Sequence, residues 1–295
     1  MNPSIQIHCI RKNGVRRRLG SKQQECDSMI IIGEKINATR KSVRSIIQER
    51  QEKALASLAK DQAEAGASYI DVNVGTGRGS AADEIEAMKW AVAVVCSAVD
   101  KPLCIDSADP PVLEAGLSAL EGRSAIINST KADEKSLGEI LPLAAGFGVP
   151  VVALAMDDKG IPETVDGRLA ACRMIVEKAR EKKIPMENLF FDPLVLPIST
   201  DARQGRVTLD TLAAVKEAFP KARTTMGLSN VSYGLPGRSA LNAAFLQMAV
   251  YAGLDAVIMD PLDEVMMDAV RSGEALVGKD RHFRKYTRAY RKKGR

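Results

Sequence analysis

A single structural unit repeats along this sequence: a short, β-rich apolar run that ends in small or polar residues, followed by a longer stretch in which apolar residues recur at helical spacing. Eight strands, each followed by a helix, in about 250 residues predict a (β/α)8 barrel of the TIM type. The expected strands are Met29–Ile32, Tyr69–Val74, Leu103–Ile105, Ala125–Ile127, Val151–Met156, Leu189–Phe191, Thr224–Met226 and Ala256–Met259.

A doubly wound parallel sheet is the alternative fold for a chain of alternating strands and helices. That fold predicts a glycine-rich turn of the GxGxxG kind after the first strand. Here the first strand is followed by Gly33-Glu34-Lys35-Ile36-Asn37 instead. The sequence therefore favours the barrel.

Several of the intervening helices can be placed from the sequence. Helical spacing of apolar residues predicts helices over Arg44–Ala65, Ala82–Val99 and Asp166–Lys182. Gly66, Gly122 and Gly148 follow predicted helices, at the position where a left-handed residue ends a helix.

The net charge of +5 is unevenly distributed along the chain. Residues 1–28 hold six basic and two acidic residues, and residues 279–295 hold nine and one, whereas the remaining 250 hold 27 and 34, a net charge of −7. We expect a basic, disordered N-terminal extension over residues 1–28, which lacks the amphipathic pattern of a transit peptide. A barrel domain over residues 29–278 and a basic C-terminal tail over residues 279–295 follow. Because the barrel itself is acidic, no nucleic-acid partner is expected.

Other classes of protein are disfavoured by what the sequence lacks. Its longest nearly apolar stretch, Leu143–Met156, is shorter than the roughly 20 residues that cross a bilayer, so we expect no membrane association. The five cysteines stand singly and there are two histidines, which argues against structural zinc, any other bound metal and a disulfide framework. A cytoplasmic protein is expected.

Polar residues end the predicted strands. In a (β/α)8 barrel the carboxyl ends of the strands surround the active site. These ends form a ring of carboxylates, carboxamides and hydroxyls with hardly any basic groups, with Met156 beside Asp157 at the end of the fifth strand: Glu34, Asn37, Asp71, Asn73, Asp106, Ser107, Asn128, Ser129, Asp157, Asp192, Ser229, Asn230, Asp260 and Asp263.

Such a ring disfavours a phosphate ligand, because acidic and amide oxygens repel an anion. It suits a neutral ligand rich in N–H donors. A pterin fits, because one carboxylate can accept hydrogen bonds from its N3–H and 2-amino group side by side. Each residue taken alone could equally be a turn or cap residue. Their coincidence at successive strand ends favours a site.

Seven segments of the sequence resemble the corrinoid-dependent methyltetrahydrofolate methyltransferases. That family shares a pterin-binding barrel with the dihydropteroate synthases and with the folate domain of cobalamin-dependent methionine synthase. The resemblance runs from Met29 to about Val277, in order. The segments are IIIGEKIN (30–37), YIDVNVG (69–75), LCIDS (103–107), INST (127–130), GIPET (160–164), FFDPLVLP (190–197) and GLSNVS (227–232).

The resemblance implies roles for particular residues. Asp106, Asn128 and Asp192 match the family's pterin-binding residues, with Asp192 facing the amino/N3 edge. Asn230 matches the side chain that approaches N5 of the folate, and is the expected catalytic residue. Its expected neighbours in the folate site are Gly227, Ser229 and Arg238. A further set is expected behind the pterin-binding residues: Glu34, Asn37, Asp71, Asn73 and Met156.

The function implied by the resemblance is methyl transfer between N5 of tetrahydrofolate and the cobalt of a separate corrinoid protein. A corrinoid carried by this chain would call for a DxHxxG motif, and the partial match at Asp280-Arg281-His282 has Lys285 in place of the glycine. The direction of transfer is open, with a slight preference for the second methyltransferase of an O-demethylase system. A homodimer is also implied.

Two other functions stay open from the sequence. A dihydropteroate synthase-like enzyme needs several cationic side chains around a pyrophosphate, and the strand ends offer few. A non-catalytic barrel that binds folate or a corrinoid protein also stays open, because it would carry the same polar ring and catalyse no reaction.

Overall fold

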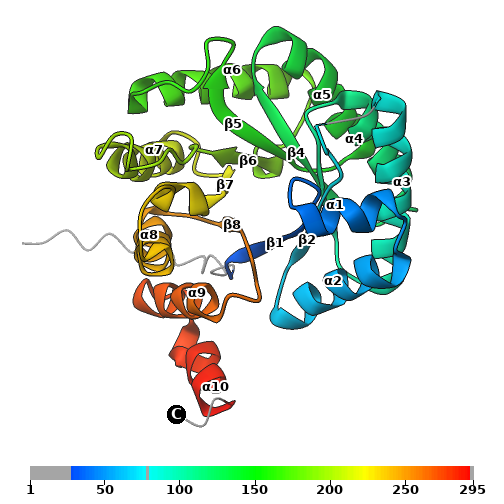
Figure 1. Cartoon of the computed structure of the whole chain (residues 1–295). Coiled ribbons are helices and arrows are strands. Elements are labelled where there is room, and N and C mark those ends of the chain that lie inside the picture. The colour runs from blue at the N-terminus through cyan, green and yellow to red at the C-terminus, as the bar shows by residue number, and fades with distance from the viewer. Residues whose placement is uncertain (1–27, 78–79, 293–295) are drawn as a thin grey trace, which may run out of the picture.

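Eight parallel strands form one sheet around the centre of this computed structural model, which describes residues 28–77 and 80–292 (Figure 1). The strands follow the order β7-β6-β5-β4-β3-β2-β1-β8. Their bounds are β1 (Ile30–Asn37), β2 (Tyr69–Asn73), β3 (Leu103–Asp106), β4 (Ala125–Ala132), β5 (Val151–Asp157), β6 (Leu189–Asp192), β7 (Arg223–Thr224) and β8 (Ala256–Met259). The predicted (β/α)8 barrel is confirmed.

The barrel closes between β7 and β8 through a few specific hydrogen bonds. β7 is only two residues long. Beyond its end, the Ile258 amide donates to the Met226 carbonyl oxygen at 2.9 Å. At the other end, the Thr224 amide donates to the Asp255 carboxylate at 3.0 Å. These bonds complete the barrel where the regular ladder of strand pairs stops.

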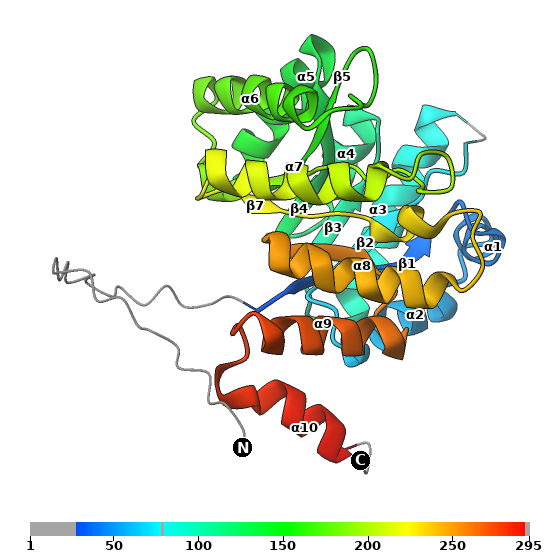
Figure 2. The same ribbon diagram turned by 90° about the vertical axis from the view of Figure 1, so that its left-hand side faces the viewer.

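Helices surround the sheet, and Figure 2 shows α7, α8 and α9 side by side on one flank, with α10 beyond α9. The helices are α1 (Lys41–Gln48), α2 (Glu52–Ala65), α3 (Ala81–Ala98), α4 (Pro110–Ser118), α5 (Glu134–Phe147), α6 (Val165–Glu181), α7 (Gln204–Ala218), α8 (Arg238–Ala252), α9 (Glu264–Leu276) and α10 (Arg284–Lys292). Short 3-10 helices are η1 (Met186–Asn188), η2 (Leu228–Ser232) and η3 (Arg281–Phe283). No helix within the described residues has the length and apolar character needed to span a membrane.

Three buried apolar clusters hold the barrel together. The outer faces of the strands pack against the helices in a large cluster and in a second one, which includes Ile31 of β1, Val257 of β8 and residues of α8 and α9. The inner faces fill the barrel with a smaller cluster of Ile32, Cys104, Ile126, Val152, Phe190 and Ala256. Because side chains alternate along a strand, residues two positions further along point into the barrel nearer its mouth.

The single helix predicted over Arg44–Ala65 is wrong, because the chain breaks between α1 and α2. Arg50 has a left-handed φ of 53°. Its guanidinium lies 5.0 Å from the centre of the Trp90 ring and donates to the Glu86 carbonyl oxygen. These contacts to α3 compensate for a conformation that a non-glycine residue rarely adopts.

Other helix ends agree with the sequence. Gly66 and Gly148 end α2 and α5 in the left-handed conformation, with φ values of 109° and 65°. Gly122, after α4, also has a positive φ, of 85°.

The C-terminal tail continues past α9 into η3 and α10. His282, the only histidine in the partial corrinoid motif, is exposed in η3 with a φ of 58°. The Asp280 carboxylate accepts from the backbone amides of Lys285 and Tyr286, at 3.1 and 2.9 Å, and so begins α10. The disorder predicted for residues 1–28 concerns positions that, apart from Ser28, lie outside the described residues.

Packing of α4 against the sheet gives a stability prediction. A Cβ atom at Gly116 would lie 2.7 Å from Ile105 Cγ2 and 2.9 Å from Met88 Cγ, both in the core. Gly116→Ala should therefore lower the free energy of unfolding by about 1–3 kcal/mol through overpacking. Urea denaturation would measure this change.

The matched control is Gly138→Ala in α5, where a Cβ atom meets nothing within 4 Å. It should raise the free energy of unfolding by about 0.4–1 kcal/mol, because alanine restricts the unfolded chain. Equal stability of the two variants would contradict the close approach at Gly116.

Candidate active site

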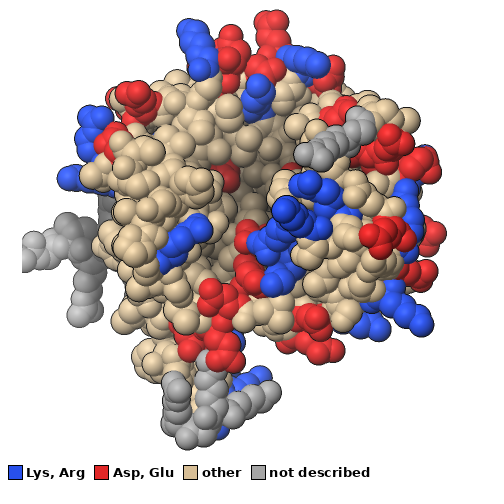
Figure 3. All heavy atoms as spheres, viewed as in Figure 1, with Lys and Arg blue, Asp and Glu red and all other residues tan. Residues whose placement is uncertain are grey.

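The carboxyl ends of the strands meet at one mouth of the barrel, which faces the viewer in Figure 1. Figure 3, in the same view, shows a hollow at the centre of this face with acidic atoms in its wall. The structure brings the predicted residues to this mouth from β1 (Glu34, Asn37), β2 (Asp71, Asn73), β3 (Asp106), β4 (Asn128), β5 (Met156), β6 (Asp192), the turn after β7 (Gly227, Ser229, Asn230) and the start of α8 (Arg238).

Asp106 is held between two carboxamide residues on neighbouring strands. The pairing register sets it beside Asn73 of β2 and Asn128 of β4. Asn73 Nδ2 donates to Asp106 Oδ2 at 2.9 Å. Burial raises the pKa of Asp106, and the hydrogen bond from Asn73 opposes that rise. The carboxyl group is thus fixed in place at the edge of the hollow.

Asp71 lies one step deeper in the barrel than Asn73, because it precedes Asn73 by two positions on the same strand. It is 2% exposed, and its Oδ1 has no hydrogen-bond partner among the described residues. Burial raises the pKa of Asp71 well above its usual value, and the nearby Asp106 carboxylate raises it further. Burial and the neighbouring carboxylate thus both favour the protonated form of Asp71.

Cys104 faces Asp71 from β3 and is fully buried. Burial raises the pKa of its thiol well above the usual value, and the two neighbouring carboxyl groups add to the effect. A thiol in such surroundings stays protonated and serves as a packing residue, not as a nucleophile.

Asp192 closes the opposite side of the hollow at the end of β6. Its carboxyl is buried and its Oδ1 accepts from the Leu194 amide at 2.8 Å. Burial raises the pKa of Asp192 to about 6, while the backbone N–H groups of Leu194 and Gly227 lower it in part. At pH 7 the group is mostly ionised. Because a carboxylate has about four acceptor positions, Asp192 keeps room for a ligand's donors.

The turn after β7 carries Ser229 and Asn230, both exposed. Arg238 Nη2 donates to the Ser229 carbonyl oxygen at 2.8 Å, and its Nε donates to Ser232 Oγ at 3.0 Å. The Arg238 guanidinium therefore stabilises the turn that presents Asn230; its expected contact with a ligand stays a prediction. Among the described residues, the Asn230 carboxamide has no hydrogen bond.

Besides Arg238, two further basic residues lie at the mouth, more than the expectation of hardly any basic groups allowed. Lys35 Nζ lies 2.9 Å from Asp260 Oδ2, and Arg40 Nη2 lies 3.1 Å from Glu34 Oε1. Burial raises the pKa of Glu34, and Arg40 opposes that rise. Because each cation is paired, neither leaves an uncompensated positive charge at the mouth.

Some of the predicted polar residues serve the local backbone. Asn37 Oδ1 accepts from the backbone amide and the hydroxyl of Thr39, which forms a turn. Asp263 caps α9 by accepting from the amides of Val265 and Met266. Within residues 28–77 and 80–292, no three His, Cys, Asp or Glu side chains group in a way that could hold a metal ion.

The sequence reasoning missed Arg168. This α6 residue is 0% exposed and contacts the loop that follows Asp192. A signal was present: Arg168 shares the spacing of the buried Cys172, Ile175 and Ala179, which puts a basic residue on the apolar face of a helix.

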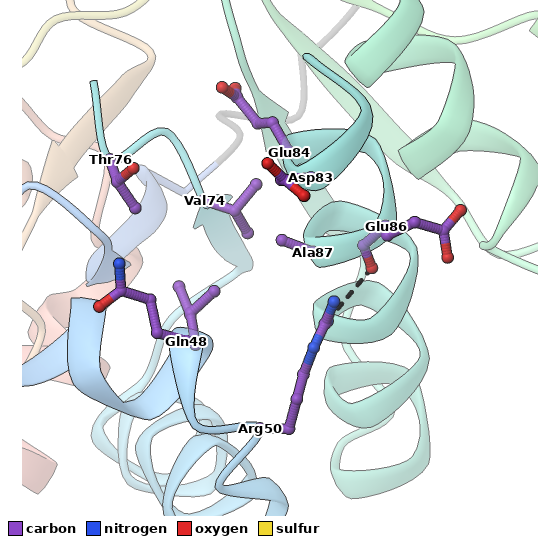
Figure 4. Close-up of a pocket in the computed structure, with 9 residues that line it drawn as sticks. Gln48, Arg50, Val74, Thr76, Asp83, Glu84, Glu86 and Ala87 are labelled. Atoms are coloured by element: carbon purple, nitrogen blue, oxygen red, sulfur yellow. Dashed lines mark hydrogen bonds between the residues drawn. The ribbon is translucent and has the colours of Figure 1, made fainter. Parts of the chain in front are cut away.

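A separate pocket lies beside the mouth, between α1 and α3 (Figure 4). Its volume is about 380 Å³, and it is lined by Ile47, Gln48, Arg50, Val74, Thr76, Asp83, Glu84, Glu86 and Ala87. None of the predicted site residues lines it. Asp83 forms the capping box of α3 with Ser80, and Arg50 donates to the Glu86 backbone, so these polar groups support the local structure.

Comparison with known proteins adds to this geometry. The model of the pterin binding enzyme family matches residues 33–260. The chain is 37% identical over 265 residues to a methylcorrinoid:tetrahydrofolate methyltransferase of Eubacterium limosum, covering 89% of this chain and 96% of that protein. It is 34% identical over 247 residues to a methionine synthase of Mycobacterium leprae, covering 79% of this chain but 20% of that protein.

Solved structures share the fold. A Clostridium difficile dihydropteroate synthase, determined in the presence of pteroic acid, aligns with a TM-score of 0.68 at 19% identity, over 86% of this chain and 98% of that one. The Vibrio fischeri enzyme aligns with a TM-score of 0.68 at 18% identity, over 86% and 94%. At this identity the likeness concerns the fold alone.

The buried Asp71 gives a prediction on stability against pH. Its pKa is raised in the folded state, so ionisation destabilises the fold increasingly as pH rises above the unfolded value. Asp71→Asn cannot ionise in the folded or the unfolded chain, so it should raise the melting temperature at pH 7.5, by about 2–4 °C per kcal/mol gained. Near pH 4 the difference should disappear.

Thermal unfolding at both pH values measures the effect, with the exposed Asp158→Asn as control. The control should behave as wild type at both pH values. A lower melting temperature for Asp71→Asn at pH 7.5 would mean that the Asp71 carboxylate is ionised and stabilising.

Proposed function

This chain belongs to the pterin-binding enzyme family, and on that premise we propose that it transfers a methyl group from a methylated corrinoid protein to N5 of tetrahydrofolate. It is a tetrahydrofolate- and corrinoid-dependent methyltransferase. One observation carries the site-level proposal: an exposed Asn230 carboxamide, without hydrogen bonds among the described residues, stands at the rim above the buried carboxyl groups of the mouth.

The pterin ring is placed by the buried acceptors. Asp192, ionised at neutral pH, accepts from the 2-amino group and N3–H together, since both donors lie on one edge of the ring. Asp106 and Asn128, neighbours across β3 and β4, meet the remaining polar ring atoms. Met156 lies on the same face of β5 as Val152 and Leu154, which supplies an apolar wall.

Methyl transfer requires little covalent chemistry from the protein itself. The corrinoid, bound to its own protein, supplies the methyl group. The lone pair of N5 forms the new N–C bond, the electron pair of the broken cobalt–carbon bond stays with the corrinoid, and N5 gives up one proton. Asn230 cannot ionise, but its carboxamide oxygen can accept from the N5–H as positive charge develops there. The released proton then passes to water at the open mouth.

The corrinoid protein is a partner, and it docks over the hollow seen in Figure 3. Asn230 is exposed at this mouth, so a partner can approach N5 from outside. The name of the Eubacterium limosum relative describes transfer from methylcorrinoid to tetrahydrofolate, which supports that direction. We place the enzyme as the second methyltransferase of an O-demethylase system, downstream of an enzyme that methylates the corrinoid protein.

A dihydropteroate synthase activity fits the mouth less well. A pyrophosphate substrate needs free cationic side chains. Lys35 and Arg40 are both engaged with carboxylates. A non-catalytic folate-binding barrel would bind tetrahydrofolate without methyl transfer, and a turnover assay separates that possibility.

The assembly and location stay proposals. A homodimer is proposed from the family resemblance, and a groove between α7 and α8, where Met248 and Tyr251 are 55% and 84% exposed, offers an apolar surface. A cytoplasmic location is proposed because Cys104 and Cys172 are buried free thiols.

Asn230→Ala tests the proposed role. Loss of one preorganised polar group at the reacting atom should lower kcat by about 10²–10³-fold. The affinity for tetrahydrofolate should change by less than about threefold, because Asp106, Asn128 and Asp192 still hold the pterin. Methylation of tetrahydrofolate from methylcobalamin and isothermal titration measure the two quantities.

The control is Asn188→Ala. Asn188 lies just before β6, at the end of that strand away from Asp192, so its replacement should leave both quantities unchanged. Unchanged turnover in Asn230→Ala would refute the catalytic role. Wild-type protein that binds tetrahydrofolate without transferring methyl would favour the non-catalytic barrel.

A further inference from the structure

Arg168 is a buried cation without an ion pair among the described residues. Its side chain is fully enclosed between α6, the end of β6 and α7. Five neutral oxygens accept its hydrogen bonds: the carbonyl oxygens of Pro162, Pro193 and Leu194, each at 2.9 Å, Gln204 Oε1 at 2.9 Å and Thr208 Oγ1 at 3.4 Å. Burying a charge in this way is costly unless something nearby compensates for it.

Two of those acceptors belong to the turn that follows Asp192. Leu194 has a φ of 65°, a left-handed conformation that is strained for leucine. In this conformation its amide donates to Asp192 Oδ1 at 2.8 Å while its carbonyl oxygen accepts from Arg168. Arg168 thus holds the turn that aims a hydrogen bond at the Asp192 carboxylate.

The charges of Arg168 and Asp192 also compensate one another. Burial lowers the pKa of the Arg168 guanidinium, and the charge of the buried Asp192 carboxylate opposes that effect. In turn, burial raises the pKa of Asp192, whereas the backbone N–H groups of Leu194 and Gly227 and the positive charge of Arg168 lower it. The buried thiol of Cys172, also on α6, interacts with the charge of Asp192 as well.

We propose that Arg168 is a positioning residue of the pterin site, which fixes the Pro193–Leu194 turn and supplies the positive charge that accompanies the buried Asp192 carboxylate. That the ligand of this site is a pterin rests on the proposed function. The coupling between Arg168 and Asp192 does not depend on that function. Arg168 reaches the ligand only through Asp192 and the turn.

The coupling can be measured without any ligand. Carbon-13 NMR of aspartate-labelled protein follows the titration of Asp192, for which we expect a midpoint of about 6 in the wild type, since burial raises its pKa to about that value. In Arg168→Met the midpoint should rise by about one pH unit, as expected when a nearby opposite charge is removed. In Arg173→Met, which removes an exposed charge from the same helix, it should stay at the wild-type value. An unchanged midpoint in folded Arg168→Met would overturn the proposal.

Arg168→Lys separates charge from geometry, and it serves as the test if the methionine variant does not fold. It keeps the buried cation, so the Asp192 midpoint should rise less than in Arg168→Met. It loses most of the hydrogen bonds to the turn, so tetrahydrofolate should bind about tenfold more weakly at every pH from 5.5 to 8.5. Wild-type affinity in Arg168→Lys would overturn the positioning role.

Titration of tetrahydrofolate into Arg168→Met completes the test. Binding should be weaker at every pH, because the hydrogen bonds to the turn are lost, and it should weaken further below pH 7, where Asp192 becomes protonated. If the affinity for tetrahydrofolate fell equally at all pH values and the Asp192 midpoint stayed unchanged, Arg168 would contribute to the stability of the fold alone. Failure of wild-type protein to bind tetrahydrofolate would refute the proposed function instead, and the ligand-free titration would still decide the role of Arg168.

Discussion

Parallel pairing of the eight strands is the constraint on which the rest of this structure depends. It sends every carboxyl end to the same mouth, so residues far apart in the chain, such as Asn73, Asp106 and Asn128, become neighbours by register alone. The same pairing buries the inner faces of the strands. Polar side chains at the strand ends therefore stand above an apolar cluster inside the barrel.

This cluster determines the chemistry of the mouth. Burial raises the pKa of Asp71, Asp106 and Asp192, and each carboxyl group differs in what opposes that effect. Asp192 has backbone donors and the charge of Arg168, so it stays largely ionised at pH 7. Asp71 has an oxygen without a partner among the described residues, and burial favours its protonated form. One barrel thus combines a carboxylate that accepts hydrogen bonds with a carboxyl group biased towards protonation, which suits a neutral, donor-rich ring better than an anion.

Much of this could be predicted from local sequence. The alternation of strand and helix signals gave the barrel, and polar residues at strand ends gave the ring at its mouth, from which the family resemblance singled out Asp106, Asn128 and Asp192. The helix break at Arg50 escaped prediction because contacts with Trp90 and the α3 backbone, distant in sequence, stabilise a left-handed arginine. The pairing of Lys35 with Asp260 escaped for the same reason, since it joins the first strand to the last.

The sequence by itself determined the fold class, the acidic character of the barrel and the list of polar residues at its mouth, because periodicity and strand-end composition are local properties. Tertiary structure alone decided which of those residues are ionised, which serve turns and caps, and which are held in place from behind. Arg168 illustrates the reason: its effect on Asp192 passes through a turn that exists only when α6, β6 and α7 are packed together. Burial and through-space charge depend on that packing.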